Sequence, residues 1–198
     1  MIDVVPPDDR RLIPSHDLDV ARAHIRQATG VDRTQPGIRR RMLAFLDEHP
    51  DAANRACVAG HLTGSALVVD RSGTRVLVLL HRKARRWLQP GGHADGDTNL
   101  ARVALREASE ESGIDGLRVA LPAIDLDIHS VDFGPEAVHL HLDVRYLVVA
   151  PDGAVAAIND ESDDAAWVTL EELARRAEGD VGIMRMARRG MDLWRQHG

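Results

Sequence analysis

One stretch, Gly91 to Ile114, constrains the fold more than any other part of the 198-residue chain. It begins as a loop rich in Gly and Asp and continues as an amphipathic helix. Asp97 or Thr98 is the expected N-terminal cap of that helix, and Gly113 suits its left-handed end. Small apolar side chains recur along one helical face, which allows close packing on a sheet. These side chains are Ala101, Ala104, Leu105 and Ala108.

Three carboxylates, Glu107, Glu110 and Glu111, share a second face of the same helix. Carboxylates three and four positions apart on a helix repel each other unless a positive charge lies among them. A solvated acidic face is the common explanation of such a cluster, and a bound divalent cation is the alternative. Oxygen ligands with the remaining positions left to water or phosphate suit Mg²⁺ or Mn²⁺.

The order of residues favours the cation, because the stretch resembles the Nudix box. That motif is a glycine, five residues, a glutamate, seven residues and then Arg-Glu, an apolar residue, any residue, Glu-Glu, any residue, Gly and an apolar residue. The matching positions are Gly92, Arg106, Glu107, Ala108, Glu110, Glu111, Gly113 and Ile114. Thr98 departs from the pattern, since the family has there a glutamate that helps to hold the arginine. The resemblance therefore leaves the support of Arg106 open.

The resemblance implies a Nudix-type α/β/α sandwich around a mixed sheet, of the α/β class. It also implies a metal-dependent pyrophosphatase that cleaves a diphosphate linkage in a nucleoside diphosphate derivative or a nucleoside triphosphate, with Mg²⁺ or Mn²⁺ as cofactor. The water-activating base would be Glu107 or a loop residue such as Glu161, which precedes the strand of Trp167. The implied catalytic residues are Glu107, Glu110, Arg106 and Glu161, and the implied metal ligands are Gly91 (through its carbonyl), Glu107, Glu110 and Glu111.

The rest of the chain divides into an N-terminal helical extension, residues 1–58, and a Nudix domain, residues 59–198, that includes the C-terminal helices. In the extension, apolar residues at helical spacing predict helices over Asp17–Ala28 and Gly37–His49. In the domain, alternating or continuous apolar runs predict strands over 65–69, 75–81, 117–129, 138–150 and a short piece ending at Val168. Helices are expected over 170–177 and 181–196.

Substrate-binding candidates come from two places near the box. A basic run leads into the glycines, where phosphate contacts and a stacking tryptophan are plausible beside the default of solvated charge. Along 138–150, His139, His141, Asp143 and Arg145 point away from the apolar side, which predicts a polar face lining a wet cleft. His129, His139 and His141 could form a zinc site, but a substrate-facing or hydrogen-bonded pair is the preferred interpretation. The substrate-binding candidates are Arg82, Lys83, Trp87, His93, His139 and His141.

The charge and the amino-acid composition limit the kinds of partner that the chain is expected to bind. The net charge of −6 argues against nonspecific nucleic-acid binding, although local basic residues can still attract an anionic small molecule. No apolar run is long enough to predict a membrane span. The single cysteine, Cys57, excludes an internal disulfide and fits a cytoplasmic location. A small nucleoside diphosphate derivative is the expected partner. The oligomeric state stays open, with a homodimer as one possibility because many members of the family dimerise.

Two other function classes remain open at this stage. A Nudix-fold module could bind a nucleotide as a sensor without turning it over, and Thr98 is the feature in its favour. An isoprenoid diphosphate isomerase shares the fold but uses a catalytic cysteine. Cys57 precedes the first expected core strand, so a buried structural thiol is the preferred interpretation.

Overall fold

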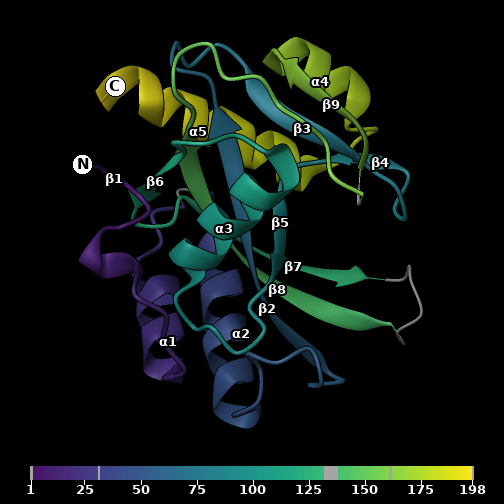
Figure 1. The fold of residues 1–198 in the computed structure, drawn as a ribbon. Helices are drawn as coiled ribbons and strands as arrows, with labels where there is room; N and C mark the ends of the chain where they lie inside the picture. Colours follow the sequence, from purple (N-terminus) through teal and green to yellow (C-terminus); the bar gives the residue numbers. More distant parts are fainter. Residues whose placement is uncertain (1, 31, 132–137, 161, 198) are drawn as a thin grey trace.

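The computed structural model describes residues 2–30, 32–131, 138–160 and 162–197. Figure 1 shows a mixed sheet with helices on both of its faces. The strands are β1 (Asp3–Val5), β2 (Gly60–Val69), β3 (Val76–His81), β4 (Arg86–Leu88), β5 (Gly91–His93), β6 (Arg118–Leu121), β7 (Asp125–Val131), β8 (His139–Val149) and β9 (Ser162–Val168). The helices are α1 (Leu18–Gln27), α2 (Gln35–Glu48), α3 (Leu100–Ser112), α4 (Leu170–Arg176) and α5 (Val181–His197), with a 3-10 turn at Arg10–Leu12.

The centre of the sheet is the parallel pair β2 and β8. These strands stay in register from Gly60 opposite Leu140 to Val69 opposite Val149. The other pairings within the described residues are antiparallel, with β6 and β7 beside β8, β5 and β3 beside β2, and β9 and β4 beside β3. Because β5 pairs with β2, the glycines that precede the box helix lie within the sheet.

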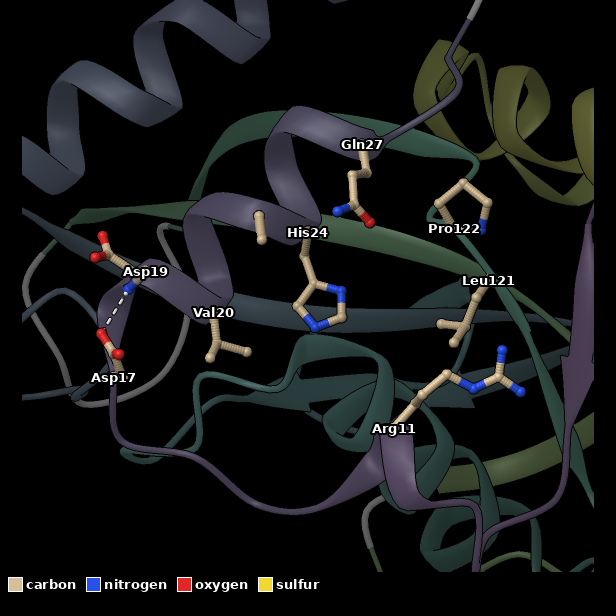
Figure 2. Close-up of a pocket in the computed structure, with 9 residues that line it drawn as sticks. Arg11, Asp17, Asp19, Val20, His24, Gln27, Leu121 and Pro122 are labelled. Carbon is tan, nitrogen blue, oxygen red and sulfur yellow. Dashed lines mark hydrogen bonds between the residues drawn. The ribbon is translucent and has the colours of Figure 1, made fainter.

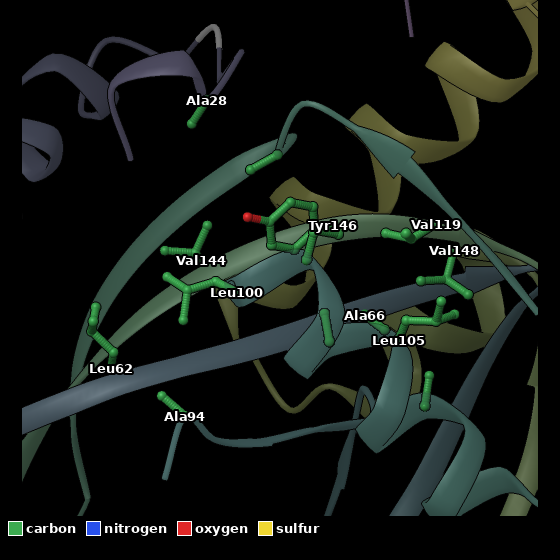
Figure 3. Packing of buried hydrophobic residues seen from close by; sticks show 14 of the residues in the cluster. Ala28, Leu62, Ala66, Ala94, Leu100, Leu105, Val119, Val144, Tyr146 and Val148 are labelled. Atoms are coloured by element: carbon green, nitrogen blue, oxygen red, sulfur yellow. The ribbon is translucent and has the colours of Figure 1, made fainter. Parts of the chain in front are cut away.

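Alternation along the central strands produces two apolar layers. Leu62, Ala66 and Tyr146 belong to a cluster that also contains residues of α1, α2 and α3, and Figure 3 shows Leu100 and Leu105 of α3 among them. The next residue on each strand, Leu67 after Ala66 and Leu147 after Tyr146, instead belongs to a second cluster with α4 and α5. Successive side chains of a strand point to opposite faces, so the two clusters lie on opposite sides of the sheet. The expected α/β/α sandwich is confirmed.

The first part of the chain contributes to the same core. The helices expected there are confirmed as α1 and α2, and Asp17 caps α1 by accepting a hydrogen bond from the N–H of Asp19. Ile25 and Met42 are fully buried in the cluster that contains α3, and β1 pairs with β6. Among the described residues, no helix combines the length and apolarity that crossing a bilayer requires.

The box helix α3 begins later than the sequence predicts. Asn99, rather than Asp97 or Thr98, is its N-cap and accepts from the N–H of Arg102, while Gly113 ends the helix at φ 64° as expected. Asp97 and Thr98 instead bond to Ser15: Asp97 accepts from its N–H, and Thr98 donates to its carbonyl through both the N–H and the hydroxyl. Between the strands expected over 117–129 and 138–150, the sequence predicts a turn at Phe133–Glu136, and this segment lies outside the described residues.

Candidate active site

Two carboxylates of α3 face the glycine strand β5. The N–H of Gly91 donates to Oε2 of Glu111 at 3.1 Å, and Glu111 is only 6% exposed. A Cβ added to Gly92 would lie 2.4 Å from the carboxyl carbon of Glu107. The carboxylate of Glu107 therefore occupies the space that a side chain at position 92 would need. The sequence-predicted residues Gly91, Glu107 and Glu111 are brought together by the packing of α3 on β5.

Arg106 is held by one of these carboxylates and by the strand. Its Nη2 donates to Oε1 of Glu107 at 2.5 Å and to the carbonyl of His93 at 3.1 Å. Its Nε is buried and finds no hydrogen-bond partner among the described residues. Thr98, at the position where the box has its first glutamate, is fully buried and bonded to Ser15. The guanidinium is thus supported by Glu107 and by the backbone carbonyl of His93, while the buried Nε has no hydrogen-bond partner in the described part of the chain.

The remaining acidic candidates differ in position. Glu110 lies on α3 but is exposed, and Glu161 lies outside the described residues. Two carboxylates one helical turn apart, with a backbone carbonyl nearby, fit the preference of Mg²⁺ for one or two protein carboxylates completed by water and phosphate oxygens. The chemistry of Glu107, Glu111 and Gly91 therefore fits the cofactor that the sequence implies.

The polar face of β8 is confirmed, but most of it is not wet. Asp143 is 1% exposed and Arg145 4%, so the expectation of a water-lined cleft is wrong there. Arg145 donates to Asp143 at 2.7 Å and to Asp127 at 3.1 Å, and Arg185 of α5 binds Asp125 with two bonds of 2.8 Å. A buried charge is retained only with such partners. α5 closes this part of the face.

Burial also acts on the pKa values of that network. It raises the pKa of the Asp125 carboxyl, although the hydrogen bonds from Arg185 and the charge of Arg145 oppose the change. Burial acts to lower the pKa of Arg145, yet the carboxylates around the guanidinium outweigh it and raise that pKa. The network links β7, β8 and α5 on the face of the sheet opposite to α3.

Five histidines gather at the other end of the polar face of β8. His61 of β2 lies opposite His141 of β8, and His129 of β7 also lies opposite His141. The ring of His61 is 4.8 Å from that of His93, 4.7 Å from that of His139 and 5.0 Å from that of His141, between centroids. Burial, with the neighbouring imidazoles, lowers the pKa of His141 to about 2.

This cluster joins the carboxylates through β5. The side chain of His93 contacts His61 and His141, while its carbonyl accepts from Arg106. The predicted residues His93, His139 and His141 thus come together, and His61 was missed by the sequence analysis. The available signal was the alternation of His61, Thr63 and Ser65 along one strand, which places the three on one face.

The basic run and Trp87 lie on the hairpin of β3 and β4. Arg82 pairs with Asp163 at 2.7 Å, and Lys83 is exposed. The guanidinium of Arg176 lies 4.2 Å from the centroid of Trp87, so α4 covers one face of the indole. Arg82 and Trp87 thus contact β9 and α4.

Two clefts lie away from the carboxylates. One, of about 450 Å³, lies between α1 and β6, and Figure 2 shows His24, Gln27, Leu121 and Arg11 around it. The other, of about 670 Å³, lies beside α5, where Asp125 and Arg185 line it. Neither cleft is lined by a residue of the box. The candidate active site is therefore identified by its chemistry and not by its depth.

A carboxylate-bearing helix docked on a glycine strand, within a sheet covered on both faces by helices, defines a pyrophosphohydrolase of the Nudix class. The sequence model of the NUDIX domain matches residues 60–187, and the chain belongs to this family. The resemblance read from Gly92 to Ile114 is confirmed. Comparison of the sequence with curated proteins gave no match.

Solved structures show the same fold. A NUDIX-family hydrolase from Clostridium perfringens is 24% identical, with a TM-score of 0.55 over 67% of this chain and 97% of that one. The Ap4A hydrolase of C. elegans, in a binary complex, is 17% identical, with a TM-score of 0.51 over 64% and 93%. The dihydroneopterin triphosphate pyrophosphohydrolase of E. coli is 16% identical, with a TM-score of 0.51 over 66% and 95%.

Proposed function

We propose that this protein hydrolyses a diphosphate linkage in a nucleoside diphosphate derivative or a nucleoside triphosphate, with Mg²⁺ or Mn²⁺ as cofactor. The observation that carries the proposal is the convergence of Glu107 and Glu111 on the glycine strand at Gly91 and Gly92. An arbitrary acidic face would turn its carboxylates to solvent, whereas Glu111 is buried against a peptide group.

Each residue of the site would have a separate role. Glu107 and Glu111, with the carbonyl of Gly91, would hold the cation, and Glu110 would complete the set from the exposed side. When bound, the cation neutralises phosphate charge and lowers the pKa of a coordinated water. Arg106 is a positioning residue, because its guanidinium fixes the carboxylate of Glu107. The base is Glu107 or Glu161.

The substrate would extend from the carboxylates past β5 toward His93, whose ring lies on the opposite face of the sheet from Glu107. His93 follows the glycines directly. Its ring contacts His141, which in turn contacts His139. Arg82, Lys83 and Trp87 of the β3–β4 hairpin would reach a more distant phosphate or base after a change in side-chain conformation. We further propose a homodimer and a cytoplasmic location, which size-exclusion chromatography and cell fractionation would test.

A substrate panel with matched variants tests the proposal. Nucleoside triphosphates, nucleoside diphosphate derivatives, Ap4A and dihydroneopterin triphosphate would be assayed with Mg²⁺ and Mn²⁺. Removing a preorganised charge-stabilising group costs about a hundredfold or more, so Glu107→Gln and Glu111→Gln should each lose that much activity. Glu171→Gln, which removes an exposed carboxylate of α4, should leave the rate unchanged. Equal rates in all four proteins would refute the site assignment.

A non-catalytic nucleotide-binding module is the second candidate, because Thr98 leaves the Nε of Arg106 without a partner among the described residues. This second hypothesis predicts saturable nucleotide binding in calorimetry, with no product formed from any compound of the substrate panel. The isomerase alternative is disfavoured by Cys57, which is 3% exposed and whose pKa is raised by burial, so the thiol is not poised as a nucleophile.

A further inference from the structure

We propose that His61, His139 and His141 form a binding site for Zn²⁺, distinct from the carboxylates of α3. Their side-chain donor atoms all lie within 4.8 Å of one another. The site is a product of strand pairing, because His61 and His141 are direct neighbours across the parallel pair β2 and β8. His139 is two residues before His141 and so points to the same face of the sheet.

The spacing of the two β8 histidines matches a metal site. The Nε2 atoms of His139 and His141 are 3.3 Å apart. Two nitrogens that bind one tetrahedral zinc ion at about 2.0–2.1 Å are about 3.3–3.4 Å apart. A hydrogen bond between the rings would explain this pair alone. It would not explain a third imidazole on the next strand, 4.7 Å and 5.0 Å from the two rings between centroids.

The donor set decides which cations fit. Imidazole nitrogens suit zinc, copper, nickel and cobalt, whereas Mg²⁺ takes oxygen ligands. Three protein ligands leave the fourth zinc position to water or to an anionic oxygen, as in zinc sites that bind substrate. The site is therefore chemically different from the pair Glu107 and Glu111, and each should select its own metal.

The scaffold around the three ligands is already ordered. His61 is 1% exposed and His139 8%, and both belong to strands at the centre of the sheet. A site on paired strands loses little conformational freedom when it binds. The ring of His93 contacts those of His61 and His141, and the preceding Gly92 packs on Glu107. β5 thus contacts both sites, with His93 on the face of the three histidines and Gly92 on the opposite face, toward Glu107.

Cobalt is a suitable probe, because tetrahedral Co²⁺ absorbs visible light strongly and octahedral Co²⁺ weakly. The untagged full chain, stripped with a chelator, should take up one tetrahedral Co²⁺ that Zn²⁺ displaces. His139→Gln and His141→Gln should each weaken binding by about a hundredfold or more, while the exposed His197→Gln should not. Cys57→Ser should also leave the spectrum unchanged, which excludes the alternative group of His49, Asp51 and Cys57.

A gain of signal guards against variants that merely fail to fold. His141→Cys should retain Co²⁺ and add a sulfur-to-metal charge-transfer band, because a thiolate can replace an imidazole at zinc and cobalt. Its circular dichroism spectrum should match that of the unaltered chain. Glu107→Gln should keep the tetrahedral Co²⁺ spectrum, so the zinc site and the proposed hydrolysis can fail separately. Tetrahedral absorption that persists in both His139→Gln and His141→Gln, or no tetrahedral absorption in the unaltered chain, would overturn the proposal.

Discussion

Replacing Gly92 with alanine should damage catalysis far more than folding. The added Cβ would lie 2.4 Å from the carboxyl carbon of Glu107, whereas nonbonded carbons settle at about 3.5–4.0 Å. The carboxylate must therefore retreat by about 1 Å or more. Since it is the end of a flexible side chain, this movement costs little stability. A displacement of about 1 Å in a catalytic group can reduce the rate by about a hundredfold.

The assay compares kcat/KM and the thermal unfolding midpoint for Gly92→Ala, Glu107→Gln and the double variant. We expect the double variant to be no slower than Glu107→Gln, because both changes act through the same carboxylate. Gly37→Ala is the control, since its Cβ would meet nothing within 4 Å and alanine favours a helix. A Gly92→Ala enzyme within about twofold of the unaltered rate would refute the reasoning, as would multiplicative losses in the double variant.

Three further predictions concern stability. Arg145→Met should lose about 3–5 kcal/mol in urea unfolding, because it removes the guanidinium paired with the buried carboxylate of Asp143, whereas the exposed Arg175→Met should lose less than about 1 kcal/mol. Burial lowers the pKa of His24 from 6.5 to about 4, so the stability due to its neutral form is present above pH 6.5 and is lost as the pH falls to about 4. His24→Gln should show a smaller loss over that range, and an identical loss would contradict this account. Thr98→Val keeps the shape and the backbone N–H but removes the hydroxyl that donates to the carbonyl of Ser15, and should cost about 1 kcal/mol in thermal unfolding, with no change if that hydroxyl bond is unimportant.

Much of the fold was accessible from local patterns. The helices of the first part, the box helix and the alternation of β8 follow from periods of 3.6 and 2, which depend only on neighbouring residues. Shorter elements such as β4 and β5 were not predicted, because three residues carry too little pattern. Their existence depends on pairing with β3 and β2. The N-cap of α3 was predicted wrongly because the hydroxyl of Thr98 is hydrogen-bonded to the carbonyl of Ser15, a residue 83 positions away in the sequence.

The amino-acid sequence alone determined the family, the box helix with Glu107 and Glu111, and the two apolar rows that form the sandwich. Only the tertiary structure decided that Arg145 lies in a buried ion network and that His61 joins His139 and His141. The physical reason is the register of β2 against β8, which joins segments 80 residues apart. A shift of one residue would send every side chain of a strand to the opposite face, and no local pattern reveals which partner lies across the sheet.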